Sequence, residues 1–153
     1  MTTTTPPLGP RVIALAHYAG RGILEQVLAR HDVTFQQSVT LRLVAVADGP
    51  VARDRLVDEV VGALKTDPAE VRSVVDELVA ARLLTAQEPS QVRITDAGRE
   101  LYERTSAETA PITARIYAGI PTEDLAAAGR VLALITERAD AEFAALTDGT
   151  PVT

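Results

Sequence analysis

The chain has 153 residues and a formal net charge of −6, and it contains no cysteine. That length suits one domain with its own core, and the lack of cysteine excludes disulfides, thiolate zinc sites and cysteine nucleophiles. Aromatic residues make up only 3% of the chain while hydrophobic residues make up 46%, which favours a mainly helical protein. The negative charge argues against broad, nonspecific binding to nucleic acid.

The first segment, residues 1–9, is a polar arm broken by prolines, and we expect it to be flexible. It has neither the basic stretch nor the apolar core of a leader sequence. No apolar run anywhere approaches the roughly 18 residues of a membrane span. We therefore expect a cytoplasmic protein.

Apolar residues at three- and four-residue steps predict a long amphipathic helix over residues 10–30, which we assign with residues 31–33 to dimerisation. Gly20 and Gly22 interrupt it. Each glycine costs a helix about 1 kcal/mol relative to alanine. Three explanations stay open: another segment approaches the backbone closely at these glycines, the glycines leave room for another molecule, or the two glycines are tolerated weak spots of the helix.

Three shorter helices follow. Thr34 is a plausible N-cap for a helix that stops at the DGP of residues 48–50. A third helix covers residues 52–65. Asp67 then caps a fourth helix, with Pro68 at its first position, where a missing N–H costs nothing. In the fourth helix we expect Val71, Val74, Val75 and Leu78 to face inward.

A small β-hairpin is predicted after the fourth helix. Val92 and Ile94 alternate with polar residues at a spacing of two, and the QEPSQ of residues 87–91 supplies the turn. Thr95 stands where the next helix needs its N-cap, with Leu101 as a buried anchor. Two short helices, a tight turn and a hairpin predict a winged helix-turn-helix core over residues 34–95.

Two long helices are expected over residues 96–147. If the first of these helices is disturbed, the disturbance lies at Pro111, which removes an internal hydrogen-bond donor. The AGIP of residues 118–121 ends this helix, and the second helix starts at Thr122. Together with the first helix they carry more apolar surface than a winged core can cover, so we assign them to a two-fold dimer. Residues 148–153 form a tail. The expected fold class is mainly α, a winged helix-turn-helix with long terminal dimerisation helices.

This order of elements resembles the MarR family of bacterial transcriptional regulators, over residues 10–147. The segments that carry the resemblance are VTFQQSVTLRLVAVADGP, DPAEVRSVVDELVAARLL, VRITDAGRELYERT and IPTEDLAAAGRVLALITE. The resemblance implies a homodimer whose affinity for double-stranded DNA is set by a small hydrophobic or phenolic ligand, bound where the long helices meet the winged core.

The chain departs from that pattern in its reading module. Arg82 stands where the family generally has glycine at the end of the recognition helix, and the wing tip lacks the family's Asp-x-Arg element. Residues 53–105 hold eight basic and eleven acidic side chains, a net charge of −3. Attraction to phosphates is therefore expected to be weak.

Three functions remain open. In the first, a DNA-binding regulator, Arg72 and Ser73 read base edges while Arg53, Arg55 and Arg93 hold phosphates. In the second, the scaffold has lost DNA binding and binds, carries or transforms a small molecule, for instance in a biosynthetic pathway. The third is a purely protein-binding role.

The candidate ligand-binding residues are polar and lie on the long helices. They are His17, Tyr18, Arg21, Gln36 and Tyr117, with His31, Gln37 and Arg115 nearby in the sequence. His17 and Arg21 share a helix face and suit an acid, base or anion contact. The simpler interpretation is an interface histidine and a solvated arginine. We find no catalytic constellation, no metal-binding spacing and no glycine-rich phosphate loop, so we expect no cofactor, and an enzyme is less favoured than a binding protein but stays open.

Overall fold

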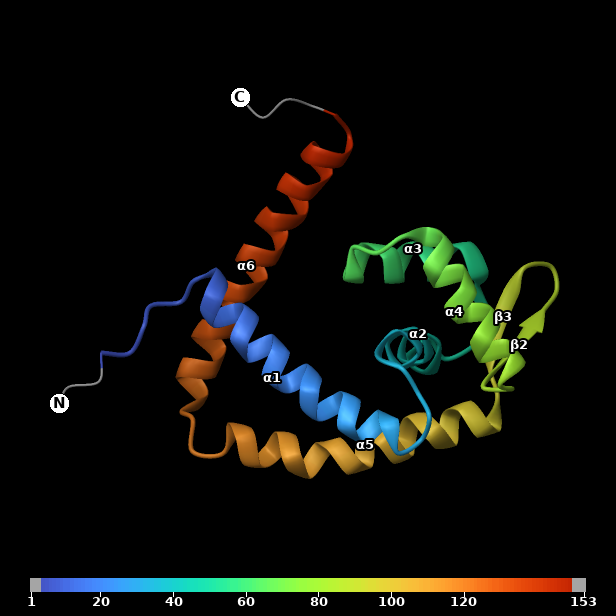
Figure 1. Ribbon diagram of the computed structural model, residues 1–153, viewed down its shortest axis with the longest axis horizontal. Coiled ribbons are helices and arrows are strands. Elements are labelled where there is room, and N and C mark those ends of the chain that lie inside the picture. Colours follow the sequence, from blue (N-terminus) through green and yellow to red (C-terminus); the bar gives the residue numbers. More distant parts are fainter. Residues whose placement is uncertain (1–3, 150–153) are drawn as a thin grey trace. The chain divides into compact units, whose positions relative to one another are not determined.

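The computed structural model describes residues 4–149, which form six helices and three short strands (Figure 1). The elements in chain order are α1 Pro10–Ala29, α2 Phe35–Val46, β1 Val51–Ala52, α3 Arg53–Leu64, α4 Pro68–Ala80, β2 Leu84–Gln87, β3 Gln91–Ile94, α5 Asp96–Tyr117 and α6 Thr122–Thr147. The mainly α fold class and the winged helix-turn-helix are thereby confirmed. The chain divides into two compact units after Ile112.

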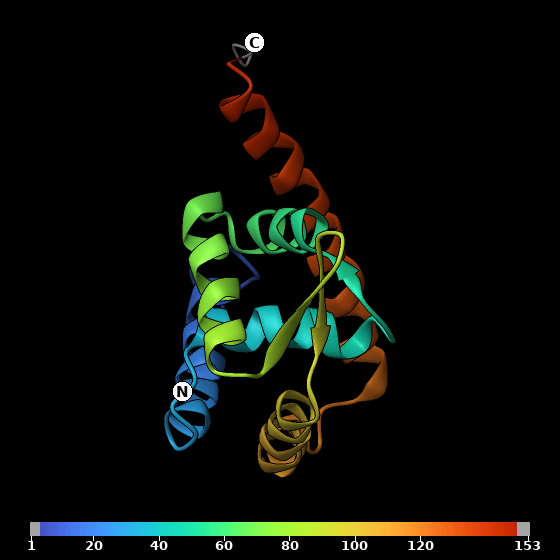
Figure 2. The same ribbon diagram turned by 90° about the vertical axis from the view of Figure 1, so that its right-hand side faces the viewer.

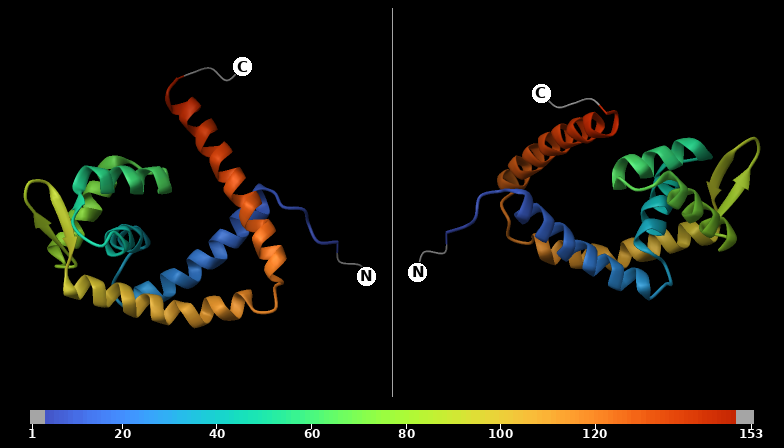
Figure 3. Two further views of the ribbon diagram at one scale, coloured as in Figure 1. Left: turned by 180° about the vertical axis from the view of Figure 1, so that it is seen from behind. Right: turned by 45° about the horizontal axis from the view of Figure 1, so that its top comes forward.

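The core of the first unit lies between α2, α3, α4 and the sheet, which gather together in both views of Figure 3. The four residues predicted to face inward from α4 are all buried, as are Leu41, Val44, Leu56, Val57, Val60, Leu84 and Val92. Leu101 and Tyr102 of α5 are half-buried and pack on this core. Leu101 is thus a partly exposed anchor, where the sequence predicted a buried one.

The three predicted N-caps are confirmed. Thr34 Oγ1 accepts from the amide of Gln37 at 3.1 Å, and the Gln37 side chain accepts from the amide of Thr34, which completes a capping box. Asp67 accepts from the amide of Ala69 at 2.7 Å. Thr95 accepts from the amide of Gly98 at 3.0 Å. Each cap satisfies amides that the first turn of a helix leaves unpaired.

The hairpin is confirmed, and a third strand extends it. β2 pairs with β3 in the register Ala86↔Val92, and β1 lies on the other side of β3 with Val51↔Val92 (Figure 2). The amide of Arg53 also donates to the carbonyl of Ser90 at 2.9 Å. A two-residue strand has no period to detect, so the sequence did not reveal β1.

The end of α4 is joined to the start of α5 by a compact junction. Arg82 adopts the left-handed conformation, with φ of 61°. The Thr95 hydroxyl donates to the carbonyl of Arg82 at 2.6 Å, and the Thr95 amide donates to the carbonyl of Leu83 at 3.1 Å. A Cβ on Gly98 would collide with that Leu83 carbonyl.

The remaining helices differ little from their predicted bounds. α5 is helical from Asp96 to Tyr117, so Pro111 does not end it, although proline has no N–H to donate within the helix. α6, in the second unit, has no buried residue among those described. Within residues 4–149 no helix has the length and apolar character needed to cross a bilayer.

The two predicted terminal segments are described only in part. Residues 4–9 of the arm form neither helix nor strand, and residues 1–3 lie outside the described residues. Residues 150–153 of the tail also lie outside them. The division into compact units falls inside α5, because its first turns pack on the winged core through Leu101 and Tyr102.

Candidate DNA-reading face and ligand cavities

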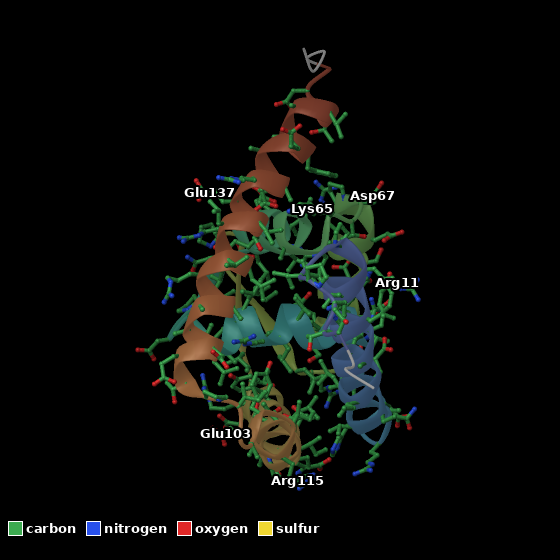
Figure 4. All side chains as sticks on the ribbon, turned by 90° about the vertical axis from the view of Figure 1, so that its left-hand side faces the viewer. Arg11, Lys65, Asp67, Glu103, Arg115 and Glu137 are labelled. Atoms are coloured by element: carbon green, nitrogen blue, oxygen red, sulfur yellow. The ribbon has the colours of Figure 1, made fainter. Side chains whose placement is uncertain are left out.

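The helix-turn-helix consists of α3 and α4, joined by residues 65–67. Lys65 and Asp67 lie at this turn in Figure 4, and Lys65 terminates α3 in the left-handed conformation, with φ of 53°. The outer face of α4 carries Glu70, Arg72, Ser73, Asp76 and Glu77, and all five are exposed. A helix that presents such a polar face beside a hairpin has the geometry of a DNA-reading element.

Carboxylates already engage two of the arginines expected to hold phosphates. Arg53 Nη2 forms an ion pair with Asp76 of α4, and Arg55 Nε lies 3.0 Å from Glu59 one turn along α3. Arg72 and Arg93 are exposed, and neither has an ion pair among residues 4–149. The face therefore offers two available guanidinium groups and two that must first leave a carboxylate.

A cavity of about 490 Å³, which we call the α2–α4 cavity, lies between α1, α2 and α4. Its lining residues are Arg21, Glu25, Thr34, Phe35, Gln36, Glu70, Ser73, Val74 and Glu77. It brings two predicted ligand residues, Arg21 and Gln36, together with Ser73, a predicted base-reading residue. A molecule in this cavity would therefore touch α4 directly.

Arg21 is held in place at the edge of the α2–α4 cavity. Its guanidinium carbon lies 4.2 Å from the centre of the Phe35 ring, and its Nε lies 3.2 Å from Glu25. A cation over an aromatic face is attracted by the electron density of the ring. Phe35 was not among the candidate site residues, and its position next to the Thr34 cap was the only signal that could have indicated it.

The other predicted ligand residues do not line this cavity. His17 and Tyr18 are exposed on α1, with ring centroids 6.0 Å apart. His31 Nε2 donates to Glu108 Oε1 of α5 at 3.0 Å, and Gln37 donates to Glu77 at 2.8 Å. Arg115 and Tyr117 belong to the second unit and are exposed.

A second cavity, of about 450 Å³, lies at the junction of α4 and α5, and we call it the hinge cavity. It is lined by His31, Asp32, Val33, Gln37, Leu78, Ala81, Leu83, Ala97, Glu100, Leu101 and Arg104. The sequence did not indicate this cavity, because its walls come from four separate segments whose lining residues are mostly small or aliphatic.

A third cavity, of about 450 Å³, lies at the base of the wing and is mostly polar. Its lining includes Arg93 and Arg99 together with Asp48 and Asp96. The two carboxylates offset the two guanidinium groups, so this cavity has little net charge to attract an anion. Among residues 4–149 no cluster of three or more histidine and acidic side chains could hold a metal ion.

Comparison with known proteins yields structural neighbours only. No family model matches this sequence, and the comparison with curated protein sequences found no match. The reduced form of MarR from E. coli superposes with a TM-score of 0.66 at 18% identity, over 88% of this chain and 97% of that one. BpsR of Bordetella bronchiseptica superposes with a TM-score of 0.64 at 23% identity, over 86% and 98%. Ligand-free NadR superposes with a TM-score of 0.68 at 19% identity, over 84% and 95%.

The chain has the MarR fold. The superpositions cover nearly the full length of these neighbours. The structural similarity therefore includes the helices outside the winged core. One NadR structure contains 4-hydroxyphenylacetate, and the DNA binding of BpsR is regulated by 6-hydroxynicotinic acid. At identities below one quarter, the MarR fold is what these comparisons establish, and function rests on the site.

Proposed function

We propose that this chain is a homodimeric, DNA-binding transcriptional regulator whose affinity for DNA responds to a small molecule. The observation that carries the proposal is the exposed polar face of α4 beside a three-stranded wing. In this proposal Arg72 and Ser73 read base edges in the major groove, while Arg53, Arg55 and Arg93 hold phosphates. A regulator of this kind works in the cytoplasm, where bacterial DNA lies.

Dimerisation is supported by the surface of α6. Leu125, Val131, Leu132, Leu134, Ile135 and Leu146 are all more than one third exposed. Such a concentration of apolar side chains on one helix costs solubility unless a partner covers it. A second copy of the chain is the simplest partner, because isologous dimers are the commonest oligomers.

The ligand site of this proposal is the α2–α4 cavity. Its volume of about 490 Å³ falls within the roughly 300–1,000 Å³ typical of small-molecule sites. A phenolic or hydrophobic ligand there would pack on Phe35 and hydrogen-bond to Gln36 and Ser73. Because Ser73 lies on the recognition helix, an occupied cavity would compete with base reading.

A second function is favoured by the ion pairs on the reading face. With Arg53 held by Asp76 and Arg55 by Glu59, and with a net charge of −3 over residues 53–105, attraction to phosphates is weak. The alternative is therefore a MarR-fold scaffold that has given up DNA and uses its cavities for a small molecule.

The deciding experiment is a fluorescence-anisotropy titration of the chain with its own upstream DNA at 50 and 200 mM salt. The regulator predicts specific binding that weakens with salt, with a slope of roughly −0.9 in log–log form for each phosphate neutralised. Absence of specific binding at both salt concentrations, together with an intact dimer by sedimentation, would favour the scaffold.

A further inference from the structure

The hinge cavity combines an apolar wall with a charged rim. Leu78, Leu83 and Leu101 line the wall, and Val33 adds a buried side chain from the α1–α2 connection. Asp32, Glu100 and Arg104 lie at the rim and are exposed. A concave apolar surface with a few polar groups on one side is the usual form of a small-molecule site.

Two strained residues adjoin this cavity. Asp32, which lines it, has φ of 55°, and Arg82, between the lining residues Ala81 and Leu83, has φ of 61°. Left-handed conformations cost a residue with a Cβ about 1 kcal/mol or more and tend to collect at functional sites. All four non-glycine residues of this kind in the described chain follow the end of a helix, so the ends of α1 and α4 meet at this cavity.

The charged side chains that line the cavity are two carboxylates, Asp32 and Glu100, and one guanidinium, Arg104, so with His31 neutral the lining has one negative charge in excess. Arg104 Nη2 donates to Glu100 Oε1 at 2.7 Å, so these two charges compensate each other. The His31 ring is engaged by Glu108. Asp32 has neither an ion pair nor a side-chain hydrogen bond among residues 4–149, and its carboxylate is the charge left over at the mouth of the cavity.

We propose that the hinge cavity is a binding site for a small protonated amine with an apolar body about the size of one ring. The body packs on Leu78, Leu83 and Leu101, and the ammonium group meets the Asp32 carboxylate. An anionic ligand of the same size is disfavoured, because it would face Asp32 while the guanidinium of Arg104 is already engaged by Glu100.

A ligand in this site could change the orientation of the recognition helix α4. Ala81 belongs to the end of α4, and Leu83 accepts the hydrogen bond of Thr95 that links α4 to α5. A ligand wedged between Ala81, Leu83 and Ala97 would press on both sides of that junction. Regulation of DNA binding through this site rests on the proposed function, whereas amine binding itself does not.

The test compares three probes that share a phenol ring and differ in the charge of the tail. Tyramine is cationic, 4-methylphenol is neutral and 4-hydroxyphenylacetate is anionic. Titrations of the full chain, without DNA, are followed by amide chemical shifts in NMR. We expect tyramine to bind most tightly and 4-hydroxyphenylacetate least, with shifts at residues 31–33, 81–83 and 97–104. If no probe binds there, or the anion binds as tightly as tyramine, the proposal is wrong.

Two matched variants test the role of the carboxylate. Asp32→Asn removes the charge and keeps a residue that tolerates the left-handed conformation. It should weaken tyramine binding roughly two- to fivefold, the range for an exposed charge pair, and leave 4-methylphenol unaffected. Asp48→Asn is the control, because Asp48 is also an exposed aspartate with positive φ, of 51°, and does not line the hinge cavity. Equal effects of the two variants on tyramine would contradict the proposal.

A third variant tests the cavity itself. Ala97→Phe places a ring in the space between Ala97 and the apolar wall, and Ala97 is exposed on the first turn of α5, so folding is preserved. Binding of both tyramine and 4-methylphenol should be lost, and retained binding would place the ligand elsewhere. Because these titrations contain no DNA, a failure of DNA binding leaves their outcome unchanged, and the two proposals fail separately.

Discussion

Arg53 and Asp76 form an ion pair between the first residue of α3 and the outer face of α4. The pair is partly exposed, so its contribution to stability is small. Its effect on the proposed DNA binding would be larger, because a phosphate would have to displace the Asp76 carboxylate before Arg53 could bind it. Asp76 also adds its own repulsion to the phosphates.

Asp76→Asn should therefore tighten DNA binding, if the chain is the proposed regulator. It frees Arg53 and removes one negative charge, so the salt slope should become steeper by about one unit. Asp58→Asn is the matched control, since Asp58 is exposed on α3 and has no ion pair among the described residues. If anisotropy shows an equal gain in DNA affinity for both variants, the gain comes from net charge alone and not from the release of Arg53.

Gly98 is a residue whose identity is fixed by its surroundings. It is buried in the first turn of α5, where a Cβ would collide with the Leu83 carbonyl oxygen and approach the Ile94 side chain. Since α5 is regular there, the requirement comes from this close approach and not from backbone conformation.

Gly98→Ala should lower the free energy of unfolding by roughly 1–3 kcal/mol, as overpacking generally does. Gly62→Ala is the control, because a Cβ on Gly62 has open space and lies in a helix, where alanine is preferred. Urea unfolding of the two variants should shift the midpoint in opposite directions. A neutral Gly98→Ala variant would mean that the junction can open at little cost.

At the scale of elements, the left-handed residue Arg82 decides how α4 ends. The conformation returns the chain so that the Leu83 amide donates to the Leu78 carbonyl at 3.0 Å. This closes α4 in the manner of a glycine C-cap, with a side chain in place of the glycine. The strain is held by the Thr95 hydrogen bonds to Arg82 and Leu83.

Arg82→Gly should raise the free energy of unfolding by about 0.5–1 kcal/mol. Relief of the left-handed conformation exceeds the added flexibility of the unfolded chain. Arg82→Ala keeps a Cβ and removes the same guanidinium, so it should give no such gain. Thermal unfolding of the pair separates the conformational effect from the charge, and equal midpoints would show that strain at this position is negligible.

At the scale of the whole molecule, the dimer is the feature on which most of the proposed function depends. A palindromic operator can be read only by two recognition helices related by symmetry. The apolar residues of α6 give the physical reason to expect a partner chain, and they can be tested without DNA.

Leu132→Glu should convert the proposed dimer to a monomer in sedimentation velocity, because it places a charge in an apolar interface. Ala126→Glu adds the same charge at a position spaced three and four residues from Glu123 and Arg130, on a polar side of α6. This control should remain a dimer. A Leu132→Glu variant that sediments like the unchanged chain would contradict the assignment of α6 to dimerisation.

The helices, their caps and the hairpin could be predicted from the sequence, because each depends on neighbours close in the chain. Thr34, Asp67 and Thr95 act on amides two or three residues away, and the inward face of α4 follows from a period of 3.6. These features depend on residues close together in the chain, so a single sequence is enough to predict them.

The site could not be predicted in the same way, because it depends on which distant segments meet. Only tertiary structure placed Arg21 on Phe35, paired Arg53 with Asp76 and enclosed the hinge cavity between Asp32, Leu78 and Ala97. β1 belongs with these, since two residues become a strand only through their partner β3. Long-range contacts leave no periodic signal in the sequence, and the candidate binding sites of this protein are formed by such contacts.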